Sequence, residues 1–214
     1  MRLDLSLYVV TDRELSRGLD HLEVGRRAVA GGADVIQLRD KELPDVELYD
    51  LATKMAKIIH DVGRLLIIND RLDIALAVGA DGVHLGQDDL PVAAARSVAP
   101  VIIIGASVSS VEEAVKAERE GADYVAVSPL FDTRSKDDAG PGHGLTTLRE
   151  IRKAVSVPVI AIGGIDRSNV SEVIASGADG VAVISAVVSQ PDVAAAAREL
   201  RSLVMVAKRA RDRS

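Results

Sequence analysis

Four copies of the tripeptide Gly-Ala-Asp, each followed within two residues by Val, decide the fold of this chain. The copies are Gly32-Ala33-Asp34-Val35-Ile36, Gly79-Ala80-Asp81-Gly82-Val83, Gly121-Ala122-Asp123-Tyr124-Val125 and Gly177-Ala178-Asp179-Gly180-Val181. In each copy an amphipathic stretch ends at a glycine, which can adopt the left-handed conformation that terminates a helix. A short apolar run, typical of a buried strand, begins directly afterwards. The intervals of 47, 42 and 56 residues each have room for two strand–helix units.

Between these copies, short β-rich runs alternate with helical patterns along the whole chain. We predict strands at Leu7–Val10, Val35–Leu38, Leu65–Ile68, Gly82–Leu85, Val101–Gly105, Tyr124–Val127, Val159–Ile162 and Val181–Ile184. We predict helices at Asp20–Gly31, Pro44–Val62, Arg71–Val78, Leu90–Val98, Ser110–Glu120, Leu145–Val155, Ser168–Ser176 and Pro191–Ala207.

Eight strands alternating with eight helices predict one α/β domain over residues 1–214, folded as a single (β/α)8 TIM barrel. We expect a basic C-terminal tail at about 208–214 that frays into solvent. The alternative is an open doubly wound sheet. That fold usually has a glycine-rich loop after its first strand, where this chain has Thr11-Asp12-Arg13-Glu14.

The composition narrows the class of protein. The 214 residues are 48% hydrophobic but only 2% aromatic, so the core must consist of the aliphatic residues that suit helix-covered parallel strands. Cysteine is absent, which excludes disulfides and thiolate metal sites and leads us to expect a cytoplasmic protein. We find no signal-peptide pattern and no apolar stretch of membrane-spanning length. The net charge of −6 argues against general nucleic-acid binding.

We therefore expect small-molecule substrates as partners, and neither nucleic acid nor membrane. The sequence leaves the oligomeric state open, a homo-oligomer included. In a TIM barrel the active site forms at the carboxyl ends of the strands. These ends are polar throughout this chain, whereas the strand starts follow Gly-Ala-Asp or Pro. The asymmetry predicts the side of the barrel on which chemistry takes place.

The second predicted strand ends in two cations and an amide. Gln37, Arg39 and Lys41 alternate along the chain and so share one face, while Leu38 points to the other. Two cations in a barrel mouth would be costly without an anion to bind, and Arg offers a planar fork to phosphate. The alternative is that Arg39 pairs with Asp40 or another carboxylate in a structural ion pair.

Two carboxylates follow the third and fourth strands. Asp70 comes after Asn69 at the end of one apolar run, and Asp89 closes the next unit. Two carboxylates with open positions suit Mg²⁺, which keeps waters and takes further ligands from substrate phosphates. The alternative is that Asp70 caps the helix that begins at Arg71 and Asp89 caps the helix entered at Pro91.

The four histidines are less informative. We expect His21 and His60 at the surface of helices. We expect His84 at the end of the fourth strand, either in the core or behind the acidic pair. No two histidines have the spacing of metal ligands.

Residues 128–144 form the longest predicted loop, rich in glycine, hydroxyl and charged residues. Loops of this length in a compact barrel are usually functional, and its hydroxyls and Lys136 could close over a phosphorylated ligand. Gly163-Gly164 and Ile184-Ser185 end the last two strands, where backbone amides form the phosphate site of many barrels. The alternatives are a loop that only connects and glycines that only permit tight packing.

Taken in order, these motifs resemble the thiamine-phosphate synthase family from about Leu7 to Ala186. The matching segments are Gln37-x-Arg39-x-Lys41, Ile68 to Arg71, His84 to Asp89, Ser107, Phe131 to Gly140, Ala161 to Ile165 and Val183 to Ala186. Three positions depart from the family pattern. Asp132 replaces a usual proline, Ser135 replaces threonine, and Val108-Ser109 replaces a stretch that often contains histidine.

The resemblance implies a transferase of thiamine biosynthesis that joins 4-amino-2-methyl-5-hydroxymethylpyrimidine diphosphate to 4-methyl-5-(2-phosphoethyl)thiazole and releases pyrophosphate. It implies catalytic roles for Arg39, Lys41, Lys136 and Ser107, and an Mg²⁺ ion held by Asp70 and Asp89. The substrate-binding residues that it implies are Gln37, Leu38, Arg39, Asp40, Lys41, Asn69, Ser107, Thr133, Arg134, Ser135, Lys136, Gly163, Gly164, Ile184 and Ser185.

Two other functions compete with this hypothesis. A sugar-phosphate epimerase or isomerase barrel would share the phosphate site but needs an acid–base pair in the mouth, where this chain has Arg39 and Lys41. A non-synthase paralogue, either a thiazole tautomerase or a regulatory barrel, would share the fold. The paired Asp70 and Asp89, and the absence of histidine after Ser107, favour the synthase.

Overall fold

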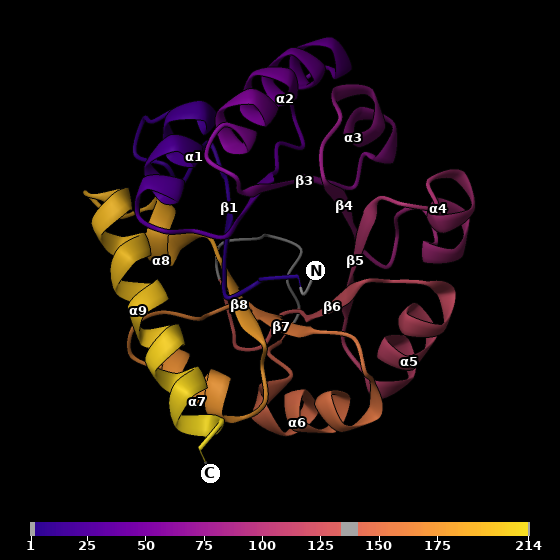
Figure 1. Cartoon of the computed structure of the whole chain (residues 1–214), viewed down its shortest axis with the longest axis vertical. Coiled ribbons are helices and arrows are strands. Elements are labelled where there is room, and N and C mark those ends of the chain that lie inside the picture. Colours follow the sequence, from indigo (N-terminus) through magenta and orange to yellow (C-terminus); the bar gives the residue numbers. More distant parts are fainter. Residues whose placement is uncertain (1–2, 134–140, 214) are drawn as a thin grey trace.

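The computed structural model describes residues 3–133 and 141–213 and confirms the TIM barrel (Figure 1). The strands are all parallel and close in chain order, so that β1 pairs with both β2 and β8. The strands are β1 (Leu7–Val10), β2 (Val35–Leu38), β3 (Leu65–Asn69), β4 (Gly82–Leu85), β5 (Ile103–Val108), β6 (Tyr124–Val127), β7 (Val159–Ile162) and β8 (Gly180–Val183).

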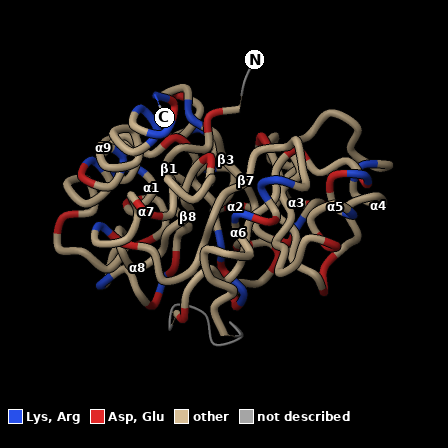
Figure 2. The backbone as a smooth tube through the Cα atoms, turned by 90° about the horizontal axis from the view of Figure 1, so that it is seen from below, with Lys and Arg blue, Asp and Glu red and all other residues tan. Residues whose placement is uncertain are grey.

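The helices form a ring around this barrel and bury one face against it. They are α1 (His21–Ala30), α2 (Asp45–His60), α3 (Leu72–Val78), α4 (Val92–Val98), α5 (Val111–Glu120), α6 (Gly144–Ala154), α7 (Val170–Ala175), α8 (Ser185–Val188) and α9 (Val193–Arg211). Charged residues lie on the helices and their connections, and the strands carry none (Figure 2). Within the described residues, every helix is too short or too polar to span a lipid bilayer.

β3 ends one residue later than predicted, β8 lies one residue earlier, and most helix ends differ by one or a few residues. Three further differences are larger. β5 begins at Ile103, because Val101 lies outside the sheet and is 96% exposed. The four-residue helix α8 was not predicted, because it is too short to show helical periodicity. The expected tail from Lys208 is helical as far as Arg211. Lys208 donates to Ser6 Oγ (2.7 Å) and Arg211 donates to Ala178 O (2.8 Å), so the end of α9 is attached to the barrel.

The four Gly-Ala-Asp copies perform one structural task, which we call the aspartate clamp. Each aspartate stands before an even-numbered strand, and its backbone N–H and its carboxylate both bond one residue of the preceding odd-numbered strand. The four pairs are Asp34 with Leu7, Asp81 with Leu66, Asp123 with Ile104, and Asp179 with Val159. The glycine that opens each copy has φ between +67° and +111° and stands at the C-cap of its helix or one residue after it, as predicted.

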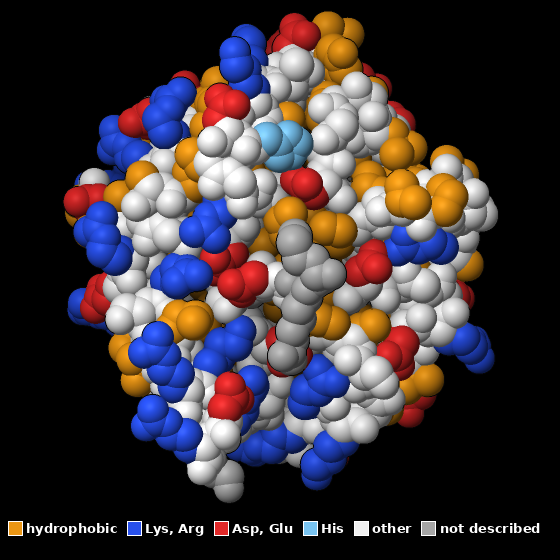
Figure 3. Space-filling view, in the orientation of Figure 1, with side chains coloured by type: hydrophobic (Ala, Val, Ile, Leu, Met, Phe, Trp, Pro, Cys, Tyr) orange, Lys and Arg blue, Asp and Glu red, His pale blue; other side chains and the backbone are white. Residues whose placement is uncertain are grey.

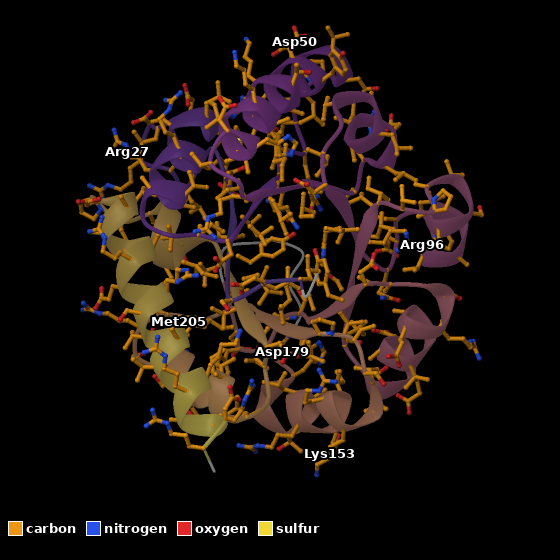
Figure 4. All side chains as sticks on the ribbon, in the orientation of Figure 1. Arg27, Asp50, Arg96, Lys153, Asp179 and Met205 are labelled. Carbon is orange, nitrogen blue, oxygen red and sulfur yellow. The ribbon has the colours of Figure 1, made fainter. Side chains whose placement is uncertain are left out.

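Each clamp aspartate also binds at least one Arg or His side chain. Asp34 contacts Arg64 and Arg201, Asp81 contacts His60, Asp123 contacts Arg96, and Asp179 contacts Arg152. Figure 4 shows Arg96 on α4 in the helix ring and Asp179 on the inner side of the ring. Across the face seen in Figure 3, Lys and Arg side chains are interspersed with Asp and Glu. The amino-terminal end of the barrel is thus tied together by charge-assisted hydrogen bonds, which are stronger than neutral ones.

Candidate active site

The loop after β2 is held by a network of buried polar groups. The Arg39 guanidinium donates to Asp12 Oδ2 (3.3 Å), and the two side chains are only 13% and 14% exposed. The backbone N–H of Arg39 donates to Thr11 Oγ1 (3.3 Å). Arg39 therefore does have a structural carboxylate partner, which is Asp12 and not Asp40. This is the one hydrogen bond that the guanidinium makes within the described residues, and it leaves most of the five N–H donors able to bind a further anion.

The Asp40 carboxylate is buried and makes its hydrogen bonds within this loop and to α1. Its carboxylate accepts from the Glu42 and Leu43 N–H groups (2.9 and 3.0 Å) and from His21 Nε2 (3.1 Å). Burial alone would raise the pKa of Asp40, but these hydrogen bonds outweigh burial and hold that pKa below its ordinary value. Asp40 therefore fixes the conformation of the segment that carries Arg39.

His21 was expected at the surface, and that prediction was wrong. The ring is 5% exposed, with Nδ1 2.7 Å from Thr11 Oγ1 and Nε2 bonded to Asp40. Helical periodicity could not reveal this environment, because both partners come from the strand ends of β1 and β2. His60 is at the surface as predicted, 2.9 Å from the clamp residue Asp81.

The two aspartates of the expected metal site follow the neighbouring strands β3 and β4. Asp70 has φ +62°, rare for a residue other than glycine, and its N–H donates to His84 O (2.8 Å). Asp89 Oδ2 accepts from Gly86 N–H (2.6 Å), and among the described residues its Oδ1 accepts no hydrogen bond. Neither α3 nor α4 has a side-chain cap, so the capping alternative is wrong for both.

A cavity of about 320 Å³ lies at the carboxyl ends of β7 and β8. Its lining includes Ser128 and Thr133 after β6, Gly163 to Asp166 after β7, and Ile184 to Ala186 with Ser189 after β8. No described residue accepts a hydrogen bond from the N–H of Gly164 or of Ala186. The Ser189 hydroxyl is buried and has no partner in the described part of the chain. The cavity thus offers donors without an acceptor, as an anion site requires.

The glycines at this cavity are required by space as well as by conformation. Gly164 has φ +62°, and a Cβ atom there would come within 2.7 Å of both Asp132 O and Phe131 Cβ. At Gly163, with φ +105°, a Cβ atom would lie 2.8 Å from Pro129 Cβ. Gly163 and Gly164 must therefore lack side chains so that residues 129–132, which follow β6, can pack over them.

A chain of buried hydrogen bonds crosses the barrel interior below the mouth. Gln37 Nε2 donates to Tyr8 OH (2.8 Å), which lies 3.0 Å from Tyr124 OH. Tyr124 OH is 3.0 Å from His84 Nδ1, and His84 Nε2 is 2.9 Å from Ser107 Oγ. We call these five residues the core chain. His84 is thus a core residue, one of the two places expected for it.

The remaining expected site residues are distributed as follows. Leu38 is buried and contributes only backbone, Lys41 is exposed, and Asn69 is half-buried at the end of β3. Thr133, Gly163, Gly164, Ile184 and Ser185 come together in the cavity. Arg134, Ser135 and Lys136 lie outside the described residues. Sequence reasoning missed Tyr8 and Tyr124 because they looked like ordinary core positions, and Ser189 because it looked like part of a connection.

Similarity to known proteins agrees with this geometry. A sequence model described as thiamine monophosphate synthase matches residues 7–187. Thiamine-phosphate synthase of Methanoculleus marisnigri is 62% identical over 203 residues, covering 94% of this chain and 96% of its own length. That of Chloroflexus aurantiacus is 50% identical over 204 residues, covering 95% and 94%.

Solved structures extend the comparison. Thiamine phosphate pyrophosphorylase from Pyrococcus furiosus is 45% identical with a TM-score of 0.90, covering 96% of this chain and 98% of the other. A 3-hexulose-6-phosphate synthase with a TM-score of 0.72 is only 23% identical, covers 92% of this chain and 99% of the other, and shares the fold alone. The family match over most of the sequence and the relatives above 50% identity together show that the chain belongs to the thiamine monophosphate synthase family, a family of transferases.

Proposed function

We propose that this enzyme joins 4-amino-2-methyl-5-hydroxymethylpyrimidine diphosphate to 4-methyl-5-(2-phosphoethyl)thiazole and releases pyrophosphate and thiamine phosphate. The observation that carries the proposal is the cavity after β7 and β8. Its described lining holds unpaired N–H and hydroxyl donors but no Lys or Arg, which suits one phosphate group on a small ligand. The cations of the mouth follow β2, outside this cavity, and we assign them to the diphosphate.

The thiazole phosphate would occupy the cavity. Gly164, Ser185 and Ala186 offer backbone donors, and Thr133 and Ser189 offer hydroxyls. Asp166 also lines the cavity, but its carboxylate accepts from the N–H and the hydroxyl of Ser168 (2.7 and 2.5 Å) and so serves its own turn. Anchoring the phosphate here would orient the thiazole ring toward the barrel axis, with its nitrogen free to attack.

The pyrimidine diphosphate would lie between the ends of β2 and β5. Gln37, Asn69 and Ser107 offer hydrogen bonds to the ring, while Arg39, Lys41 and Lys136 offer positive charge to the diphosphate. As the bond between the methylene carbon and the diphosphate oxygen breaks, negative charge grows on the leaving group, and cations placed there stabilise the transition state. The electron-rich aminopyrimidine carries the positive charge left on the methylene carbon, and the thiazole nitrogen then bonds to it.

The donor set at Asp70 and Asp89 fits Mg²⁺. No group of three His, Asp or Glu side chains in the described part of the chain could form a complete cage. Mg²⁺ does not need one, because it binds through one or two carboxylates, several waters and phosphate oxygens. When bound, the ion would neutralise charge on the diphosphate. The residues themselves fix the donor positions: the Gly86 N–H orients Asp89, and the Asp70 N–H ties the end of β3 to His84 of β4.

The test is pyrophosphate release from both substrates with Mg²⁺, in wild type and in Asp70→Ala and Asp89→Ala. We expect each substitution to abolish turnover and leave the unfolding temperature nearly unchanged, because neither residue caps a helix. Asp45→Ala, which removes an exposed partner of Arg71, is the matched control and should keep wild-type activity. A wild-type protein that releases no pyrophosphate would refute the proposed function. A mutant at near wild-type rate under limiting Mg²⁺ would refute the metal role of that residue.

A further inference from the structure

The core chain links two residues on strands that are not neighbours in the barrel. Gln37 lies in β2 and Ser107 in β5, and the links between them come from Tyr8 in β1, Tyr124 in β6 and His84 in β4. β1 and β6 are not neighbours in the sheet, so the bond between the two phenols crosses the barrel interior. The chain is therefore not a feature of any one strand pair.

The architecture makes room for this chain. Gly105 of β5 is in register with both His84 and Tyr124, and a Cβ atom at Gly105 would lie only 2.0 Å from Tyr124 Cζ. The missing side chain lets Tyr124 reach past β5 and stack on His84, with ring centroids 5.6 Å apart. Tyr8, Tyr124, Gln37 and His84 are between 0% and 8% exposed. Burial raises the pKa of both phenols, so they stay neutral hydroxyls.

A chain of this kind has only one self-consistent direction once one end is fixed. The amide nitrogen of Gln37 can only donate, so Tyr8 accepts from it and must give its own proton to Tyr124. Tyr124 then gives its proton to His84 Nδ1, which leaves the ring proton on Nε2. Nε2 donates to Ser107 Oγ, and the Ser107 proton has to point elsewhere. Reversing any single link would leave a buried donor facing a donor, which costs free energy.

We propose that the core chain fixes which hydrogen-bonding groups the substrate meets: an acceptor at Gln37 Oε1 and a donor at the Ser107 hydroxyl. The inference rests on the proposed function for the placement of the pyrimidine ring between β2 and β5. The amino group of the aminopyrimidine is a donor and matches Gln37 Oε1. A ring nitrogen or a diphosphate oxygen is an acceptor and matches Ser107. Tyr8, Tyr124 and His84 are positioning residues, which act through Gln37 and Ser107 and not on the reacting atoms.

This arrangement selects against a pyrimidine whose amino group is replaced by oxygen. The 4-oxo analogue would place a carbonyl oxygen against Gln37 Oε1, acceptor against acceptor. Sites built to bond a particular polar group reject analogues without it by large factors, because buried groups are left unpaired. Tyr124→Phe removes the acceptor of the Tyr8 proton. The Gln37 amide must then turn its oxygen toward Tyr8 and present nitrogen to the substrate, which weakens the preference for the amino compound.

The first experiment reads the direction of the chain without substrate. Nitrogen-15 NMR of His84 in the wild-type protein should show a protonated Nε2 and an unprotonated Nδ1. Tyr124→Phe should shift the ring toward a mixture of tautomers, because Nδ1 loses its donor. Tyr8→Phe should leave the tautomer unchanged, because Tyr124 still donates to Nδ1. A wild-type ring protonated at Nδ1, or at both nitrogens, would overturn the proposal whether or not the enzyme makes thiamine phosphate.

The second experiment measures binding of the aminopyrimidine diphosphate and of its 4-oxo analogue by isothermal titration without the thiazole. We expect the wild type to prefer the amino compound by roughly a hundredfold or more. Tyr124→Phe and Tyr8→Phe should each lower that ratio at least tenfold, and Tyr49→Phe, at an exposed tyrosine of α2, should preserve it. If Tyr124→Phe fails to fold, Tyr8→Phe carries the test. Folded variants that all keep the wild-type ratio would refute the proposal, and pyrophosphate release by wild type would show that the proposed function itself stands.

Discussion

Replacing Asp34 by asparagine tests the aspartate clamp at its most buried member. The carboxylate is 1% exposed and accepts from Leu7 N–H (3.1 Å), Arg64 (2.8 Å) and Arg201 (3.0 and 3.2 Å). Asparagine keeps one oxygen for the Arg64 side but places an amide NH₂ against the donors of Leu7 and Arg201. The substitution therefore leaves two buried or half-buried donors without an acceptor.

Breaking a buried ion pair by removing one partner costs about 3–5 kcal/mol. Arg64 and Arg201 are 34% and 29% exposed, so solvent screening favours the lower part of that range, about 3–4 kcal/mol. For a chain of this length that corresponds to a fall in Tm of roughly 6–16 °C. Differential scanning calorimetry would measure it. Asp45→Asn, with a carboxylate 74% exposed, is the control and should change the unfolding free energy by less than about 1 kcal/mol.

Because Asp34 lies at the end of the barrel opposite the candidate site, the folded Asp34→Asn protein should keep the wild-type kcat below its lowered Tm. Two results would refute the reasoning. The first is an Asp34→Asn protein as stable as Asp45→Asn, which would mean that the clamp contributes nothing measurable. The second is a loss of kcat in fully folded protein, which would mean that the two ends of the barrel are coupled.

Three further predictions concern the site. Gly164→Ala should raise the KM for the thiazole phosphate at least tenfold, since its Cβ atom has no room, whereas Gly79→Ala, at nearly the same φ of +67° but with open space around it, should not. Arg39→Ala and Lys136→Ala should each lower kcat by roughly a hundredfold with a smaller change in KM, because these cations stabilise the negative charge that develops on the leaving group in the transition state. Steady-state kinetics that show a change in KM alone would mean that these cations only bind the substrate and do not stabilise the transition state. The pKa of Asp40 is lower in the folded protein than in the unfolded chain, so its hydrogen bonds stabilise the fold above the unfolded-state carboxyl pKa of about 3.9, and this stabilisation is lost as the pH falls through the lower folded-state value. Asp40→Asn should therefore be less stable than wild type at pH 7 and should lose less stability than wild type on acidification. Urea titrations at pH 7 and at acidic pH in which both proteins lose the same unfolding free energy would contradict this.

The sequence was sufficient for most of the barrel. β1, β2, β4, β6 and β7 begin and end at the predicted residues, because each apolar run is bounded by a Gly-Ala-Asp copy, a proline or a polar turn. β5 was misplaced because Val101 is apolar yet exposed, and apolar character alone does not show where pairing starts. Residues that bind each other across the fold could not be predicted. Tyr8 and Tyr124 are 116 residues apart in sequence, and only closure of the barrel brings their hydroxyls together.

The expected site residues also separate into those that strand order places and those that side-chain packing places. Those in the cavity could be found because a barrel fixes which ends of its strands meet. The partners of Arg39, Asp40 and His21 could not, because they depend on side-chain packing between the ends of β1 and β2. The magnesium site remains a prediction that the proposed kinetics must test.

The four clamps also divide the barrel into four βαβ units, each closed by contacts within itself. The clamp bonds span only 27, 15, 19 and 20 residues, so each unit can form its first inter-strand rung before the rest of the chain is in place. Local contacts of this kind speed folding, because little loop entropy is lost in making them. Assembly then becomes a matter of joining four nearly equivalent quarters. The residues at the carboxyl-terminal mouth of the barrel differ from one βαβ unit to the next, whereas the amino-terminal end has the same aspartate in all four units.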